Sequence, residues 1–207
     1  MVAGILLFPG AGSGREQPGL VAVEQASPVP VERVDFGYRR AGRRSPSRAP
    51  VLVAEVGEAA RALADRLGVT TGDLVMGGRS MGGRMCSMAV AEGLPAAGLV
   101  LVAYPLHPPG RPDAARTAHL AQLDLPCLFV SGTRDPFGSP AELAAATALI
   151  PGPVTHHRVE NGGHELRGSE AEVAEVVVRW VAGLSGPAGG PRGSGPRARG
   201  SRSRGRG

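Results

Sequence analysis

The sequence has no lysine, only two cysteines and few aromatic residues, which make up 3% of its 207 residues. All 23 basic residues are therefore arginines, which together with abundant Gly, Ala and Pro indicates a GC-rich genome and says little about function. Cys86 falls on an expected helix and Cys127 on an expected buried strand. We expect both to be small core residues and not a disulfide.

The sequence also lacks any apolar run long enough to cross a membrane. Its apolar start, Met1 to Phe8, has no basic segment before it and is too short for a secretory signal peptide. No His, Cys, Asp and Glu set has metal-ligand spacing, and no phosphate or dinucleotide fingerprint follows a strand. We expect a cytoplasmic protein without membrane contact, metal or cofactor.

The formal net charge of +5 is unevenly distributed. Residues 183–207 hold six arginines and no acids, which leaves 17 arginines against 18 acids in residues 1–182. The sequence predicts one domain over residues 1–184, followed by a disordered Gly/Pro/Arg-rich tail at 185–207. The tail has no aromatic residue to stack on bases, so we expect at most weak, non-specific contact with nucleic acid.

Short apolar runs alternate with helical patterns through the predicted domain. This alternation is typical of an α/β fold, with a mostly parallel sheet of about six strands covered by helices on both faces. The expected strands are Ile5–Phe8, Val31–Phe36, Leu74–Gly77, Leu99–Ala103, Cys127–Ser131 and Val154–Val159. The expected helices are Ala49–Leu67, Met81–Glu92, Pro140–Leu149 and Ser169–Leu184.

The stretch Gly77-Gly-Arg-Ser-Met-Gly-Gly-Arg84 joins a predicted strand to a predicted helix. Its Gly78-x-Ser80-x-Gly82 spacing is that of a nucleophile elbow, a strained turn that presents a serine hydroxyl above a sheet. Glycine is needed on both sides because a Cβ there would collide where strand and helix cross. In so glycine-rich a sequence the spacing alone arises readily by chance, so its context must agree.

The context agrees, because an acid and a histidine follow in the right order. Asp135 comes after the strand Cys127–Ser131, and His164 comes after the last strand. Parallel strands gather their carboxyl ends at one edge, where open α/β sheets place their sites. We expect Ser80 to be a nucleophile, His164 its general base and Asp135 the group that orients the imidazole. The backbone N–H groups of Met81 and Ala11 are expected to form the oxyanion hole.

With these residues placed, residues 4–183 resemble the α/β-hydrolase superfamily. The stretches Tyr104–Gly110, Arg116–Leu120 and Gly132–Gly138 more narrowly resemble a dienelactone-hydrolase-like group, which includes the hydrolase-like domains of testis-expressed protein 30 and of an NSL histone-acetyltransferase complex subunit. The resemblance implies a small hydrolase without a large lid domain. Two features depart from this group. Pro9 replaces the usual histidine before the first Gly-x-Gly, and two antiparallel strands that often open the fold have no counterpart.

The sequence therefore predicts an esterase-like serine hydrolase that acts on a small ester, thioester or lactone. The alternative is a non-catalytic interaction module that keeps the fold as a subunit of a protein complex. Arg79 and His107 are the candidate substrate-binding residues, although Arg79 fits the surface equally well and a hydrogen-bonded loop residue is the simpler interpretation of His107. The arginines of the basic loop at 37–50 are the best reason to expect an anionic substrate, although a solvated loop is the simpler interpretation of such a charge run. His156 and His157 are expected to be structural.

Overall fold

A computed structural model of the chain describes residues 1–184, and the predicted tail at 185–207 lies outside the described residues. A six-stranded sheet forms the centre, with strand order β2-β1-β3-β4-β5-β6, and every neighbouring pair of strands is parallel. The predicted α/β class is confirmed. The strands are β1 (Gly4–Phe8), β2 (Val31–Arg33), β3 (Leu74–Arg79), β4 (Gly98–Val102), β5 (Cys127–Gly132) and β6 (Val154–Val159).

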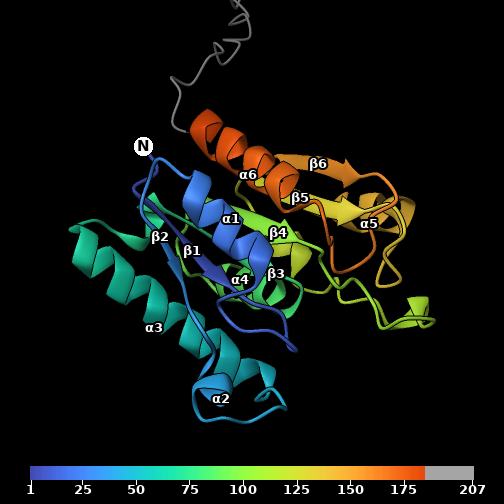
Figure 1. Ribbon diagram of the computed structural model, residues 1–207, viewed down its shortest axis with the longest axis horizontal. Coiled ribbons are helices and arrows are strands. Elements are labelled where there is room, and N and C mark those ends of the chain that lie inside the picture. The colour runs from blue at the N-terminus through green and yellow to red at the C-terminus, as the bar shows by residue number, and fades with distance from the viewer. Residues whose placement is uncertain (185–207) are drawn as a thin grey trace, which may run out of the picture.

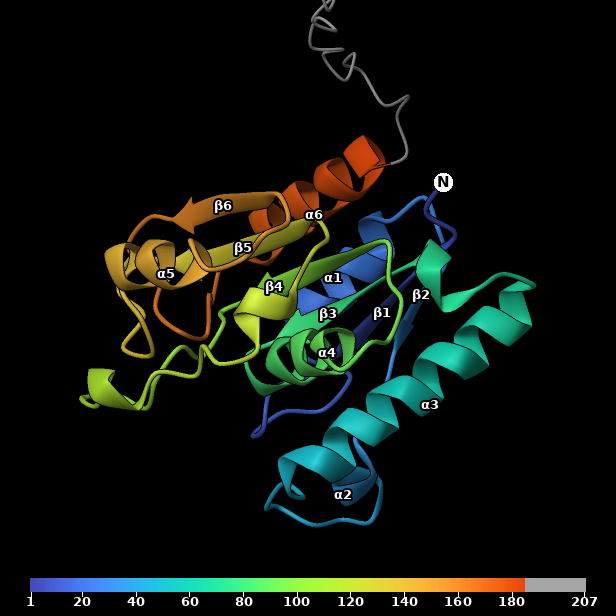
Figure 2. The same cartoon turned by 180° about the vertical axis from the view of Figure 1, so that it is seen from behind.

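The helices cover both faces of the sheet. Figure 1 shows α1 and α6 in front, and Figure 2 shows α3, α4 and α5 against the opposite face. The helices are α1 (Pro18–Ala26), α2 (Gly37–Arg40), α3 (Ala49–Leu67), α4 (Met81–Ala91), α5 (Pro140–Thr147) and α6 (Glu170–Leu184). Short 3-10 turns occur at Thr71–Asp73, Pro112–Ala114 and Leu120–Gln122.

Two separate hydrophobic cores follow from this layering. Alternate residues of a strand point to opposite faces, so Leu6 and Phe8 of β1 join the core under α3, α4 and α5. Ile5 and Leu7 join the core under α1 and α6. Burial on both faces explains why the central strands read as uninterrupted apolar runs in the sequence.

Most element boundaries match the sequence prediction. Helix α3 has the predicted bounds and ends at Gly68, whose φ of 67° is left-handed. Ser139 caps α5 in a capping box with Glu142. Both cysteines are free and buried, as expected. No helix within residues 1–184 is long and apolar enough to span a membrane, and no large lid domain is inserted there.

The region between β1 and α3 differs from the prediction. Helix α1 was not expected, because its first residues are the loop formers Pro18 and Gly19. Only Leu20 and Val23 of this helix are buried, so its apolar pattern is weak. It is nucleated locally, since the Gln17 side chain accepts a hydrogen bond from the backbone N–H of Leu20 at 3.0 Å. Strand β2 is three residues long, shorter than the predicted Val31–Phe36, and lies at the edge of the sheet.

The crossing of α4 over the sheet is unusually close. A Cβ on Gly78 would lie 2.0 Å from the carbonyl oxygen of Phe8, and a Cβ on Gly82 would lie 2.2 Å from the same atom. Real Cβ atoms do not come this near to a backbone oxygen. The two glycines of the elbow therefore let β3 and α4 pack directly against the end of β1.

We predict that Gly82→Ala destabilises the domain by about 3 kcal/mol or more, since backbone would have to move to admit the methyl group. Gly183→Ala is the matched control, because nothing lies within 4 Å of a Cβ placed there. The control should be neutral or stabilising by up to about 1 kcal/mol. Urea unfolding of both variants measures the difference, and equal stabilities would contradict the crossing described above.

Candidate active site

Ser80 lies in the turn between β3 and α4, above the carboxyl edge of the sheet. Its φ of 51° and ψ of −118° are rare for a residue with a side chain, and such strain costs about 1–3 kcal/mol. The turn is held by the backbone N–H of Ser80, which donates to the carbonyl of Val102 at 2.8 Å. This strained turn is the geometry that the Gly-x-Ser-x-Gly spacing predicted.

A chain of hydrogen bonds runs from Ser80 through His164 to Asp135. The Ser80 Oγ lies 2.9 Å from Nε2 of His164, and the Nδ1 of His164 lies 2.8 Å from Oδ2 of Asp135. Because the carboxylate can only accept, Nδ1 carries the imidazole proton and leaves Nε2 free to accept from the serine hydroxyl. The structure thus brings together three residues that lie far apart in the sequence.

The carboxylate of Asp135 is fixed by the loop in which it lies. Its side chain is 2% exposed, and its Oδ1 accepts a hydrogen bond from the backbone N–H of Phe137 at 2.8 Å. The Phe137 ring packs on the imidazole of His164, with centroids 4.1 Å apart. The imidazole is therefore oriented by a buried acid at one edge and by an aromatic ring on its face, a contact that the sequence did not indicate.

Arg79 secures the loop that carries His164. Its guanidinium lies 2.6 Å from the Glu165 carboxylate and donates to the backbone carbonyl of His164 at 3.0 Å. The Arg79 side chain is 6% exposed. We predicted Arg79 as a substrate-binding residue. It does line the cleft described below, but its charge is already paired, so its contacts suit it to holding His164 in place.

Met81 and Ala11, the two predicted oxyanion donors, line the same cleft as Ser80. Within the described residues, no acceptor contacts the backbone N–H of Met81 or that of Ala11. The carbonyl of Gly10, which shares a peptide unit with the Ala11 N–H, accepts from the backbone N–H of Ser13 at 3.2 Å. The Ala11 carbonyl accepts from the Tyr38 hydroxyl at 2.8 Å. The two peptide units on either side of the Ala11 Cα are therefore each held by a hydrogen bond, which restricts the orientation of the Ala11 N–H.

A cleft of about 630 Å³ opens over these groups. It is lined by residues from the loops that follow β1, β3, β4, β5 and β6, including four arginines and one acid. The lining residues are Ala11, Gly12, Ser13, Arg79, Ser80, Met81, Arg84, Pro105, Arg116, Phe137, His164, Glu165 and Arg167. Its volume suits a small molecule, and its charge is strongly positive.

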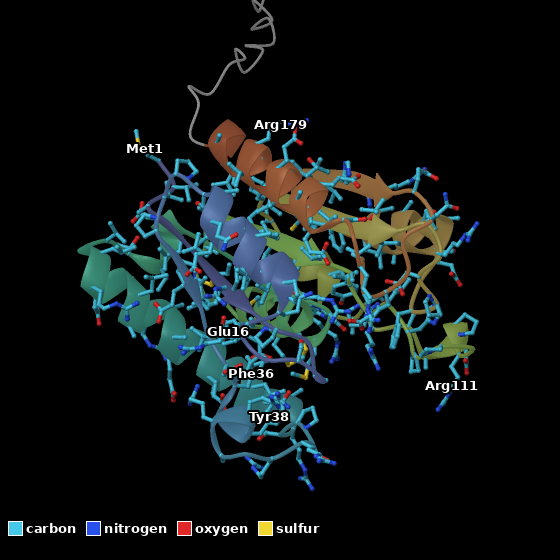
Figure 3. All side chains as sticks on the ribbon, viewed as in Figure 1. Met1, Glu16, Phe36, Tyr38, Arg111 and Arg179 are labelled. Atoms are coloured by element: carbon cyan, nitrogen blue, oxygen red, sulfur yellow. The ribbon has the colours of Figure 1, made fainter. Side chains whose placement is uncertain are left out.

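His107 does not line this cleft, which departs from its predicted role. It is buried beneath the loop after β4, with Nδ1 2.9 Å from the carbonyl of Pro108 and Nε2 3.5 Å from the Glu142 carboxylate. Residues 37–50, predicted as one basic loop, form α2, a short loop and the start of α3, and they contribute no lining residue either. Figure 3 labels Tyr38, the residue through which that segment reaches the Ala11 carbonyl.

The loop after β4 is tied to α4 through His119. The Ser87 hydroxyl donates to the carbonyl of Arg84 at 2.8 Å, so its oxygen accepts from Nε2 of His119, also at 2.8 Å. Burial and the nearby charge of Arg84 lower the pKa of His119 to about 4. A neutral His119 thus fixes the segment that carries Arg116, an anchor that sequence patterns did not reveal.

The remaining histidines have structural contacts. His156 lies 2.9 Å from the Thr147 hydroxyl and stacks on Phe129, and His157 lies 2.7 Å from the Glu172 carboxylate. In residues 1–184 no group of three or more His, Cys, Asp or Glu side chains could hold a metal ion.

Comparison with known proteins places the chain among hydrolase folds. Residues 2–180 match the family described as "Alpha/beta hydrolase domain". Est1E from Butyrivibrio proteoclasticus is 15% identical, with a TM-score of 0.72 over 88% of each chain. An alpha-beta serine hydrolase homologue from Coxiella burnetii is 19% identical, with a TM-score of 0.69 over 87% of this chain and 85% of that one. The esterase domain from a Rhodothermus marinus protein is 16% identical, with a TM-score of 0.66 over 87% and 86%. Such low identities show a shared fold.

We predict that protonation of His119 destabilises the domain as the pH falls. Its folded pKa of about 4 lies below the ordinary 6.5, so between these values the unfolded chain binds more protons. The free energy of unfolding should therefore decrease as the pH falls from about 6.5 to about 4. His119→Gln keeps a donor for Ser87 but does not titrate, so its stability should change less. Urea unfolding of both proteins at about pH 7 and about pH 5 measures this, and equal losses would rule out the assigned role of His119.

Proposed function

The chain belongs to the alpha/beta hydrolase domain family, and from that premise we propose that it is a serine hydrolase that cleaves a small ester, thioester or lactone. The observation that carries the proposal is the continuous hydrogen-bond chain from Ser80 through His164 to Asp135. It ends in a cleft large enough for a small molecule. A fold retained only for protein contacts has no physical need for this arrangement.

Acylation begins when the Ser80 oxygen attacks the acyl carbon. The Oγ–carbon bond forms while Nε2 of His164, 2.9 Å away, takes the hydroxyl proton. The carbonyl π electrons move onto oxygen and give a tetrahedral oxyanion. The imidazolium that results faces the buried Asp135 carboxylate, which stabilises its charge without accepting the proton.

The oxyanion then needs donors, and the backbone supplies them. Met81 is the first residue of α4, so its N–H points out of the helix terminus next to Ser80 and carries the positive end of the helix dipole. The Ala11 N–H completes the pair from the loop after β1. Each such donor contributes about 3 kcal/mol of transition-state stabilisation.

The intermediate collapses when the bond between the acyl carbon and the leaving group breaks. Protonated His164 returns its proton to the departing alkoxide or thiolate, which leaves an ester between Ser80 and the acyl group. Water then attacks this ester, with His164 again accepting and returning a proton. The products are a carboxylic acid, an alcohol or thiol, and free Ser80.

The narrower resemblance to dienelactone-hydrolase-like proteins fits a cleft with no large lid domain above it in residues 1–184. We therefore propose substrates that are small and water-exposed on one side. Because the backbone supplies the Ala11 N–H, Pro9 in place of histidine does not remove the donor. The segment is tied to Tyr38 through the Ala11 carbonyl.

We predict that Ser80→Ala lowers kcat/KM for p-nitrophenyl esters by at least about 10⁴-fold, because the acyl-enzyme can no longer form. Ser47→Ala is the matched control, since Ser47 lies in the loop at 37–50 and outside the cleft. It should keep wild-type activity. If Ser80→Ala keeps the turnover of the wild type, Ser80 is excluded as the nucleophile.

Asp135→Asn should lower kcat by about 10³- to 10⁴-fold with little change in stability. An amide can donate to Nδ1, which would favour the imidazole tautomer that cannot accept the Ser80 proton. Steady-state kinetics measures the loss, and circular dichroism checks that the variant is folded. A folded Asp135→Asn protein within about tenfold of wild type would remove Asp135 from the mechanism.

A further inference from the structure

Arg84 lies one helical turn beyond Ser80 on α4. Its backbone N–H donates to the carbonyl of Ser80 at 3.1 Å, and four residues of helix span about 6 Å. Long side chains on a helix lean back toward its N-terminus, which here is the end that carries Ser80. Arg84 lines the same cleft as Ser80. Arg84 therefore presents its side chain to the cleft that holds Ser80.

The charge of Arg84 has no counterpart in the described part of the chain. No carboxylate forms an ion pair with it, and its Nε is buried without a hydrogen-bond partner. Burial lowers the pKa of this guanidinium, and the nearby positive charge of Arg116 lowers it further. Arginine stays protonated even so. A partly buried cation is thus held beside a second cation.

Arg116 reaches the cleft from the loop after β4 and is held in place by neutral groups. Its guanidinium donates to the carbonyl of Pro105 at 3.1 Å, and its backbone carbonyl accepts from the Tyr104 hydroxyl at 3.0 Å. Within residues 1–184 it too lacks a carboxylate partner. The one acid that lines the cleft, Glu165, already pairs with Arg79.

The backbone segments that carry Arg84 and Arg116 are tied to one another. Ser87, three residues after Arg84 on α4, links that helix to His119, three residues after Arg116. The link restrains the backbone near Arg116 against moving away from α4. Two like charges held together next to a nucleophile are stabilised when an anion binds between them, and the arginine fork matches carboxylate and phosphate oxygens.

We propose that Arg84 and Arg116 form an anion subsite, and that the substrate carries a carboxylate or phosphate about one helical turn from the scissile carbonyl. This inference rests on the proposed hydrolase function and adds a substrate class to it. A five-carbon dicarboxylic half-ester is a small test substrate of this class, because it carries one carboxylate and one ester carbonyl separated by three methylene groups. The anion-binding arginines are thus in the cleft and not in the loop at 37–50.

Substrate pairs that differ in one charge test the subsite. The first pair is p-nitrophenyl hydrogen glutarate and p-nitrophenyl pentanoate, which place the charge on the acyl group. The second is para-acetoxybenzoate and phenyl acetate, which place it on the leaving group. In at least one pair, wild type should prefer the anionic member, and Arg84→Gln and Arg116→Gln should each reduce the kcat/KM ratio by about tenfold or more.

Arg44→Gln is the matched control, because this exposed arginine belongs to the loop at 37–50 and does not line the cleft. It should keep the wild-type ratio. Comparing ratios between variants cancels the intrinsic reactivity of each ester. Wild-type hydrolysis that depends on Ser80 but shows no anionic preference in either pair would overturn the subsite and leave the proposed function intact.

Direct binding tests the subsite without turnover. Glutarate and inorganic phosphate are titrated by calorimetry into Ser80→Ala protein, which distinguishes carboxylate from phosphate as the preferred group. At least one should bind, and adding Arg84→Gln should weaken binding by about tenfold or more, with Arg44→Gln as control. If Arg84→Gln abolishes anion binding but the wild-type protein hydrolyses none of the esters, the subsite is supported and the proposed reaction is rejected. If neither anion binds, or both variants bind equally, the subsite is wrong.

Discussion

The close crossing of β3 and α4 over the end of β1 determines the geometry of the whole site. Gly78 and Gly82 both pack against the carbonyl of Phe8 at distances that exclude any Cβ. This contact forces Ser80, which lies between them, into its strained conformation. It also places the Ser80 hydroxyl and the first N–H of α4 at the edge where the oxyanion loop leaves β1. One backbone contact thus fixes the positions of Ser80 and of the first turn of α4, on which the proposed nucleophile and oxyanion donor depend.

The all-parallel sheet supplies the remaining groups at the same edge. Strand β3 lies between β1 and β4, so the loops that carry Ala11 and Arg116 flank Ser80 on either side. The loops after β5 and β6 then bring Asp135 and His164. The arginines at this edge differ in whether they form an ion pair. Arg79 is neutralised by Glu165 and holds the His164 loop, while Arg84 and Arg116 keep their charge for a ligand.

Sequence patterns predicted those features that are fixed by local sterics and by strand order. The elbow glycines and the order of Ser80, Asp135 and His164 belong to this group. Contacts that depend on loop conformation could not be predicted. His107 was a candidate for lining the cleft, yet it is buried in the loop after β4, with its Nδ1 near the carbonyl of Pro108. Arg84 directly follows the elbow motif, but its missing counter-charge is apparent only when all nearby carboxylates are located. Helix α1 was missed because its glycine and proline resemble a loop.

Mass spectrometry can detect directly whether Ser80 forms a covalent adduct, as an acyl-enzyme mechanism requires. The wild-type protein is treated with a fluorophosphonate, its intact mass is measured, and the modified residue is located in a proteolytic digest. We expect one adduct per chain, on Ser80, which Ser80→Ala abolishes and which denaturation before treatment prevents. An unmodified folded protein, or an adduct at another residue, would contradict it.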